Sequence, residues 1–109
     1  MALFQGIYFQ GGVAASGNAT FSIPVGEIAI VTAFFVVNEN ATSTTIDIAI
    51  LPAGTSSPSS QHYLYKGFTL NGNDTFSWSG RLPMSPQDSF YVAAGSGGGV
   101  AFSVFGDKK

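Results

Sequence analysis

The sequence contains no cysteine and very little charge. Without cysteine among its 109 residues, disulfide frameworks, cysteine-ligated zinc sites and thiol catalysis are all excluded. Lysine and arginine together number 4, and aspartate and glutamate 6, which gives a formal net charge of -2. Four basic residues cannot neutralise a run of phosphates, so we expect no nucleic-acid partner. The single histidine also leaves few groups that could transfer protons near neutral pH.

Long hydrophobic runs are lacking as well. The longest apolar stretch, Ile28–Val37, is interrupted by Thr32 and reaches only half of the roughly 20 residues that a membrane-spanning helix requires. The first ten residues contain no lysine or arginine, and Gln5 and Gly6 break their apolar character. A secretory signal needs a basic region followed by a continuous apolar one, so none is expected. The sequence therefore predicts no membrane partner.

Apolar residues are nevertheless abundant, at 45% of the chain, and they recur with a period of two between turn residues. No segment has a helical period. We therefore predict an all-β fold, a single antiparallel β-sandwich domain spanning residues 1–109, of the jelly-roll or the immunoglobulin-like type. The expected strands, about eight in number, are Leu3–Gln10, Ala19–Ile23, Ile28–Asn38, Thr44–Leu51, Tyr63–Leu70, Asp74–Ser79, Ser89–Ala94 and Val100–Phe105.

Two of these strands differ in whether one face or both faces are apolar and must be buried. In Thr44–Leu51, branched aliphatic residues alternate with smaller or polar ones, as expected for a strand with one buried face. In Ile28–Asn38 both faces are apolar, so a central strand, or one whose outer face meets another subunit, is predicted. Strict alternation places Ile28, Ile30, Phe34 and Val36 on one face and Ala29, Val31, Ala33, Phe35 and Val37 on the other.

The connecting segments carry recognisable turn chemistry. Asn71-Gly72 predicts a tight hairpin, because primed turns need the positive φ that asparagine and glycine tolerate. The run Ser96–Gly99 predicts a second, flexible hairpin tip. Pro52–Ser60 is expected to be an exposed loop, the longest in the chain and therefore a candidate contact loop. Asp107–Lys109 is expected to be a frayed tail.

The inventory of reactive side chains does not favour an enzyme. His62 is the sole imidazole, and no G-x-S-x-G nucleophile elbow accompanies it. Asn71, Asn73 and Asp74 resemble an oxygen-rich calcium loop, but a tight turn explains them with fewer assumptions. We therefore expect a non-enzymatic protein with no catalytic, cofactor-binding or metal-binding residue.

The aromatic residues allow two interpretations. Trp78, Tyr63, Tyr65 and Tyr91 combine an apolar ring with a polar group, which suits a subunit interface, a core or a carbohydrate-stacking platform. Phe76 lies on the same strand face as Trp78, and serines occupy the opposite face. This alternation favours packing of Trp78 in the core or in an interface.

Several segments of the second half carry a resemblance to a known family. Ile48–Gly54 ends a strand in Pro-Ala-Gly, and it is followed by His62–Leu64, Leu70–Thr75 and Gln87–Val92. In this succession the chain resembles small β-sandwich virion accessory proteins of tailed bacteriophages, of the decoration, head-fibre or tail type. The likeness covers Ile28–Gly106. Because its motifs are turn and core residues, it implies a fold and a setting but no site.

The resemblance and the low surface charge imply the same role. We expect a capsid decoration or cement protein, located in the virion, that bridges subunits of the major capsid protein. A homo-oligomer is expected, with a trimer favoured because icosahedral shells offer three-fold positions. A tail, neck or head-fibre component is the alternative, and a carbohydrate-binding module is the second alternative.

Overall fold

The computed structural model describes residues 4–108. It contains eight strands and one short 3-10 helix, and no helix long and apolar enough to cross a membrane occurs in this range. The elements are β1 (Phe4–Val13), β2 (Asn18–Ser22), β3 (Ala29–Val37), β4 (Thr44–Leu51), η1 (Ser60–His62), β5 (Tyr63–Leu70), β6 (Thr75–Met84), β7 (Ser89–Ala94) and β8 (Val100–Lys108).

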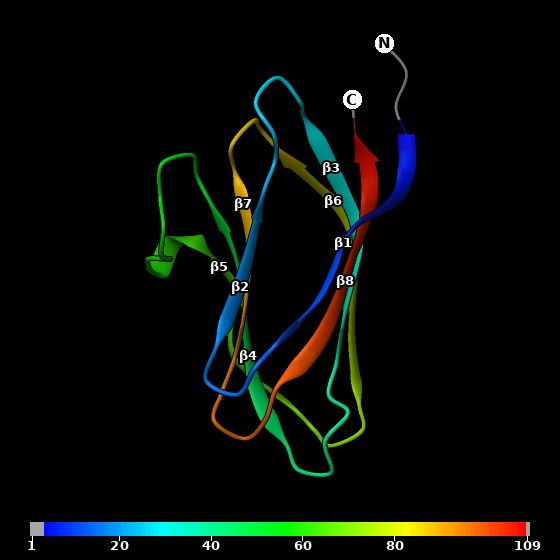
Figure 1. The fold of residues 1–109 in the computed structure, drawn as a ribbon, viewed down its shortest axis with the longest axis vertical. Coiled ribbons are helices and arrows are strands. Elements are labelled where there is room, and N and C mark those ends of the chain that lie inside the picture. Colours follow the sequence, from blue (N-terminus) through cyan, green and yellow to red (C-terminus); the bar gives the residue numbers. More distant parts are fainter. Residues whose placement is uncertain (1–3, 109) are drawn as a thin grey trace.

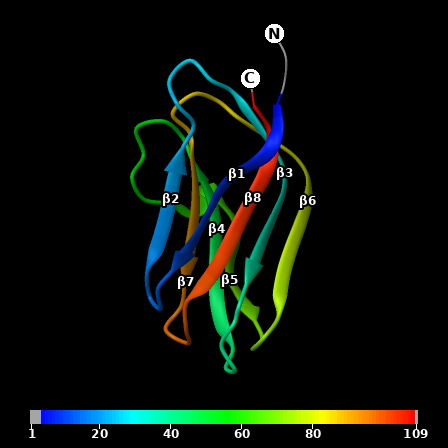
Figure 2. The same ribbon diagram turned by 45° about the vertical axis from the view of Figure 1, so that its right-hand side comes forward.

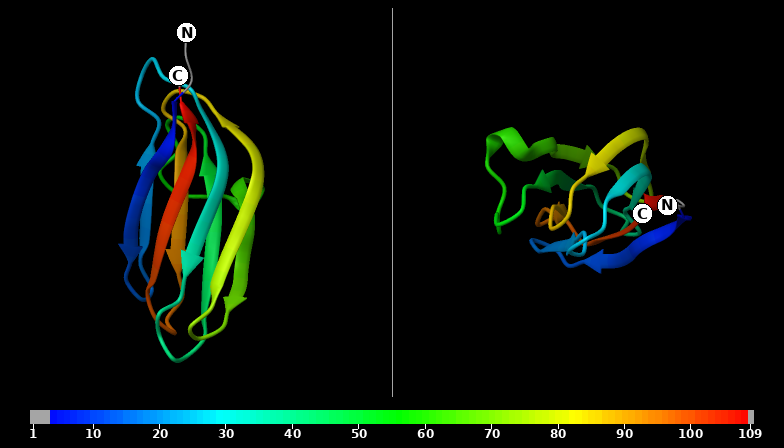
Figure 3. Two further views of the ribbon diagram at one scale, coloured as in Figure 1. Left: turned by 90° about the vertical axis from the view of Figure 1, so that its right-hand side faces the viewer. Right: turned by 90° about the horizontal axis from the view of Figure 1, so that it is seen from above.

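The strands form two four-stranded antiparallel sheets that pack face to face (Figures 1 and 3). Sheet A has the order β1-β8-β3-β6, and sheet B has the order β2-β7-β4-β5. Consecutive strands thus alternate between the sheets, except that β4 and β5 are neighbours in sheet B. This is the order of an eight-stranded jelly roll, so the predicted β-sandwich is confirmed and the immunoglobulin-like alternative does not apply.

All eight predicted strands are present, but three are longer than expected. β1 continues to Val13, and β6 continues to Met84 instead of ending at Ser79. The prediction of a frayed C-terminal tail is wrong for Asp107 and Lys108, which pair in β8 with Ile30 and Ala29 of β3. Because β8 lies between β1 and β3, neighbours on both sides hold its backbone to its end (Figure 2). Lys109 lies outside the described residues.

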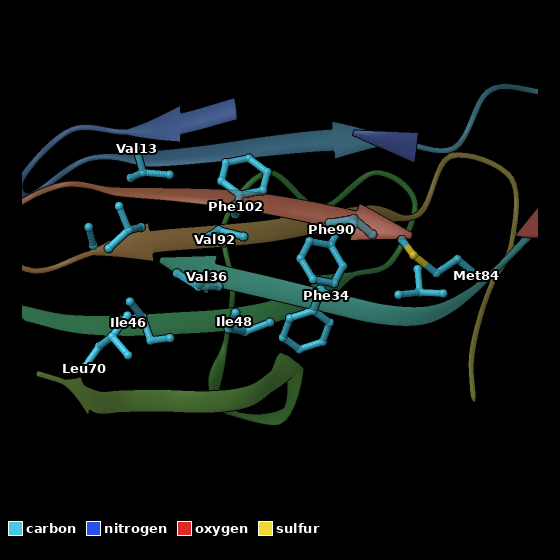
Figure 4. Close-up of a cluster of buried hydrophobic side chains, with 14 of the residues drawn as sticks. Val13, Phe34, Val36, Ile46, Ile48, Leu70, Met84, Phe90, Val92 and Phe102 are labelled. Atoms are coloured by element: carbon cyan, nitrogen blue, oxygen red, sulfur yellow. The ribbon is translucent and has the colours of Figure 1, made fainter. Parts of the chain in front are cut away.

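The core lies between the two sheets and includes Phe34, a residue that is 1% exposed (Figure 4). β3 carries an extra residue relative to β8 between Val31 and Ala33. As a result Val31 and Phe34, three positions apart, both face the core. The prediction that Phe34 shares a face with Ile28 and Ile30 is therefore wrong. The strand is nevertheless central, as predicted. The inward residues of β3 are Ala29, Val31, Phe34 and Val36.

The outer face of β4 is less exposed than its sequence indicates. Ala49 and Leu51 are fully buried, although alternation places them opposite Ile46 and Ile48. The segment that follows β4 turns at Pro52 and returns through η1, which contacts β4. The loop of residues 52–59 itself is largely exposed, as predicted.

Neither predicted hairpin exists, because both connections cross between the sheets. Residues 71–74 link β5 of sheet B to β6 of sheet A, and residues 95–99 link β7 to β8 in the same way. Both lie with residues 38–43 at the end of the sandwich opposite the termini (Figure 1). In the first turn the positive φ, 59°, belongs to Asn73. Gly72 is needed instead because a Cβ there would collide with the carbonyl of Ala41.

The glycine run before β8 is closely packed against neighbouring backbone. A Cβ on Gly97 would collide with the carbonyl oxygen of Ser43, and one on Gly99 would collide with the carbonyl oxygen of Val13. The absence of side chains therefore lets three backbone segments approach one another closely. The connection is therefore more closely packed than the sequence predicts, and its flexibility stays a prediction.

Asn38 ties this end of the sandwich together. Its side chain is 0% exposed, and its Nδ2 donates to the carbonyl oxygens of Thr42, Leu70 and Asn71 at 2.9, 3.2 and 3.2 Å. Its Oδ1 accepts hydrogen bonds from the backbone and side-chain nitrogens of Asn40, both at 3.0 Å. One buried amide thus satisfies polar groups of the connections at residues 38–43 and 71–74, which lie outside the hydrogen-bond ladders of the two sheets.

We expect Asn38→Ala to lower the free energy of unfolding by about 2–3 kcal/mol, because buried carbonyls lose their donor. The exposed Asn18 at the start of β2 is the matched control, and Asn18→Ala should change stability by less than about 0.5 kcal/mol. Urea unfolding of both variants measures the difference. Equal stabilities would show that the Asn38 network does not hold this end of the fold.

Candidate functional site

The polar residues singled out in the sequence have structural partners. His62 is half-buried, and its Nδ1 accepts a hydrogen bond of 3.0 Å from the backbone of Ser59, which caps η1. Asp74 accepts the backbone N–H of Thr75 at 2.9 Å through its Oδ1, and Asn73 donates its N–H to the carbonyl of Asn40. Within residues 4–108 no three His, Asp or Glu side chains gather where they could hold a metal ion.

Two tyrosines lie on the outer face of sheet B. Tyr63 and Tyr91 both pair with Ala49 of β4, one on each side of it. The Lys66 Nζ lies 3.9 Å from the Oδ2 of Asp47 and 4.5 Å from the centre of the Tyr63 ring. Burial raises the pKa of Tyr91, and the neighbouring Tyr63 and Asp47 raise it further. The Lys66 amino group thus covers one face of the Tyr63 ring.

A row of aromatic side chains closes the sandwich between the edge strands β5 and β6. Phe76 of β6 lies 4.8 Å from Tyr65 and 4.9 Å from Phe68, ring centre to ring centre, and both contacts are edge-to-face. Trp78 continues the row along β6. We call Tyr65, Phe68, Phe76 and Trp78 the aromatic seam. It joins the two sheets through side chains at an edge where β5 and β6 are not hydrogen-bonded neighbours.

Trp78 packs against the core, as predicted. Its ring stacks on Phe34 at 5.1 Å with an interplanar angle of 12°, and it is partly buried. A Cβ on Gly80 would lie 3.0 Å from the indole, so the backbone also approaches the ring closely. One face of the indole is thus occupied, which disfavours the carbohydrate-platform interpretation.

The outer face of sheet A carries a continuous surface without charge. The ladders of β3 with β6 and β8 place three rows side by side there, with Ser77, Phe35 and Ser103 in the middle. Phe35 is 38% exposed, and its ring meets that of Phe105 at 5.5 Å. We call this surface the uncharged face. Its residues are Ala33, Phe35, Val37, Thr75, Ser77, Ser79, Ala101, Ser103 and Phe105.

This composition is typical of the centre of a protein interface, where charged residues are depleted and aromatic ones enriched. The residues of the uncharged face lie on three adjacent strands, β6, β3 and β8. A shallow hollow of about 390 Å³ adjoins this face at Ala101 and lies between β1, the residues after β3 and the start of β8. Asn40 lines this hollow, but its side-chain amide already donates a hydrogen bond of 2.9 Å to the carbonyl oxygen of Gly99. The uncharged face is therefore the better candidate for function.

Sequence reasoning found part of this surface. The doubly apolar strand pointed to Phe35 and Val37, whereas Ser103 and Phe105 were assigned only to a strand. The sequence signal for these residues is the alternation of small or hydroxyl residues with aromatic or aliphatic ones in Thr75–Ser79 and Ala101–Val104. Only the sheet order shows that these segments flank β3.

Comparisons with known proteins give little further information. No protein-family model matches the chain, and no curated protein matches it. Among solved structures, it is similar to one described as "Structure of infectious bursal disease virus Gx strain", with a TM-score of 0.48 and 11% sequence identity. The match covers 98% of this chain and 32% of that chain. A likeness at this level carries no argument about function, and the resemblance to phage accessory proteins stays a prediction.

Removing the indole tests the packing of the aromatic seam. We expect Trp78→Ala to lower the free energy of unfolding by about 3 kcal/mol, because a large ring is lost beside Phe34. Ser79→Ala, on the opposite face of the same strand, should change it by less than about 0.5 kcal/mol.

Trp78 is the one tryptophan of the chain, so its fluorescence reports on the same contact. Native emission should be blue-shifted and should move to the red on unfolding. Emission that already lies at the water-exposed limit in the native protein, with unchanged stability of Trp78→Ala, would contradict the packed arrangement.

Proposed function

We propose that this chain is a structural protein of a virus particle, and more specifically a phage capsid decoration or cement protein that bridges subunits of the major capsid protein. The observation that carries the proposal is the uncharged face of sheet A. It presents Phe35 among small and hydroxyl side chains on three adjacent strands. Such a surface is suited to permanent contact with protein and not to a small substrate.

The mechanism would be burial of surface rather than catalysis. Each Å² of apolar area removed from water contributes about 25 cal/mol, before the costs of association are subtracted. One copy that covers two neighbouring capsid subunits would resist their separation by this amount, and the effect would be repeated over the shell. Hydroxyl groups of Thr75, Ser77 and Ser103 would supply adaptable hydrogen bonds across the contact.

The fold is compatible with this role but does not decide it. Jelly rolls occur in viral capsid domains, in lectins and in cupins, and one fold hosts many functions. Support for a virion setting therefore comes from the sequence resemblance together with the surface. A carbohydrate-binding module has less support, because Trp78 is partly buried and stacks on Phe34 of the core.

Copy number in purified particles of the source virus tests the proposal. Quantitative mass spectrometry should find hundreds of copies for a decoration protein. Six or twelve copies would favour the tail, neck or head-fibre alternative. Absence of the chain from the particle would overturn the virion role.

A charge placed on the proposed contact tests the surface itself. We expect Phe35→Lys to abolish incorporation into particles, because a buried, unpaired ammonium group is costly at an interface. The control is Thr69→Lys, at an exposed position of β5 in sheet B, which should be incorporated like the unchanged chain. Melting temperatures of the two free proteins establish that both remain folded. Normal incorporation of Phe35→Lys would exclude the uncharged face as the contact.

A further inference from the structure

The four edge strands of the sandwich differ in how they are protected against pairing with another chain. β2 is only five residues long, and β1 has a register shift between Ile7 and Phe9. β5 has an exposed Lys66 followed by Gly67 at φ 66°, and its pairing with β4 shifts at this point. Short length, bulges and lysine are the usual devices that prevent edge-to-edge association.

β6 lacks these devices in its first half. Arg81 and Pro83 interrupt only its second half, whereas Thr75–Ser79 contains no charge, no proline and no glycine. β6 pairs with β3 alone and forms the outer margin of sheet A (Figure 2). An uncharged edge of this kind is a ready template for another strand.

Two hydrogen bonds show which backbone groups of β6 face outward. Asn38 donates its N–H to the carbonyl of Asp74 at 2.9 Å, so residue 74 faces β3. The N–H of Thr75 instead bonds to the Oδ1 of Asp74 at 2.9 Å, so residue 75 faces away from β3. Because neighbouring residues alternate in direction along an antiparallel strand, Ser77 and Ser79 also direct their N–H and C=O groups to the free side.

We propose that Thr75–Ser79 pairs with the same segment of a second copy, antiparallel and about a two-fold axis at Ser77, so that two A sheets join into one of eight strands. The two Ser77 residues would exchange both backbone hydrogen bonds. Each Ser79 N–H would donate to the carbonyl of Thr75 in the other copy. The contact is isologous, so it closes with two copies.

The segment is complementary to itself in this register. Thr75 lies opposite Ser79 on the outer face, and Phe76 lies opposite Trp78 on the inner face, where cross-strand aromatic pairs stabilise a sheet. No charged residue opposes a like charge within the paired segment. Phe68 of the adjacent edge strand β5 contacts Phe76 and is 40% exposed, and the second copy would shield it.

This pairing differs from the trimer expected from the sequence. A three-fold contact would join two different surfaces, whereas this edge matches itself. The inference does not depend on a virion role. The dimer would form whatever protein the uncharged face contacts, and it can be tested on the isolated chain.

Sedimentation of the purified protein over a range of concentrations tests the dimer. We expect a monomer–dimer equilibrium for the unchanged chain and at least about tenfold weaker association for Ser77→Lys, which places two like charges directly opposite each other. Ser77→Pro should weaken it similarly by removing the outward N–H. Proline is tolerated on an edge strand where that N–H faces solvent, so this variant should still fold. Ser103→Lys, on the same sheet face but in the interior strand β8, is the matched control and should associate normally.

Cross-linking supplies an independent measurement, because the chain has no cysteine of its own. Opposed residues of a hydrogen-bonded antiparallel pair have Cα atoms about 5.5 Å apart, within disulfide range. Ser77→Cys should therefore form a disulfide-linked dimer on mild oxidation, and Ser103→Cys should not.

A monomer at all accessible concentrations, a trimer, or a dimer that persists in Ser77→Pro would overturn the pairing. These results leave the virion role open, since copy number in particles measures it separately. Conversely, a dimer disrupted at Ser77 in a chain absent from particles would retain the pairing and remove the proposed function.

Discussion

The extra residue in β3 between Val31 and Ala33 determines how the rest of the structure is arranged. It rotates the second half of the strand so that Phe34 faces the core, where its ring contacts Trp78 of the same sheet and Phe90 of the opposite sheet at 5.1 and 5.2 Å. Without it, Phe35 would face the core and Phe34 would face outward. The aromatic core, the aromatic seam and the uncharged face all depend on this one change of register.

The same change places apolar side chains where solvent would otherwise be expected. With Phe34 and Val36 inward, Phe35 and Val37 must lie on the outer face of a central strand. Flanking strands contribute serine, threonine and alanine there, and no charged residue is found within the uncharged face. The edge strand β6 follows the same alternation, which leaves its first half neutral and directs the backbone groups of Ser77 and Ser79 away from β3. The pairing of β3 with β6 therefore accounts both for the uncharged face and for the uncharged edge of sheet A.

Much of the fold could be predicted from the sequence, because period-two patterns report which segments are strands. The faces of β3 could not, since a single inserted residue leaves the composition unchanged while reversing the side-chain directions. Asn71-Gly72 predicted a hairpin because its two residues suit tight turns, yet Gly72 is required by the approach of Ala41, a residue distant in sequence. The candidate site was found in part, as Phe35 and Val37 stood out, whereas its flanking residues depend on the strand order.

The central claim is that the first half of β6 bonds to β3 on one side and to a second copy on the other. Amide hydrogen exchange resolved by residue tests it most directly, with measurements at low and high protein concentration. The amides of Phe76 and Trp78 should be protected at both concentrations, because they bond to β3. Those of Ser77 and Ser79 should exchange rapidly when the protein is dilute and become protected when it is concentrated. Rapid exchange of Ser77 and Ser79 at every concentration would contradict the claim.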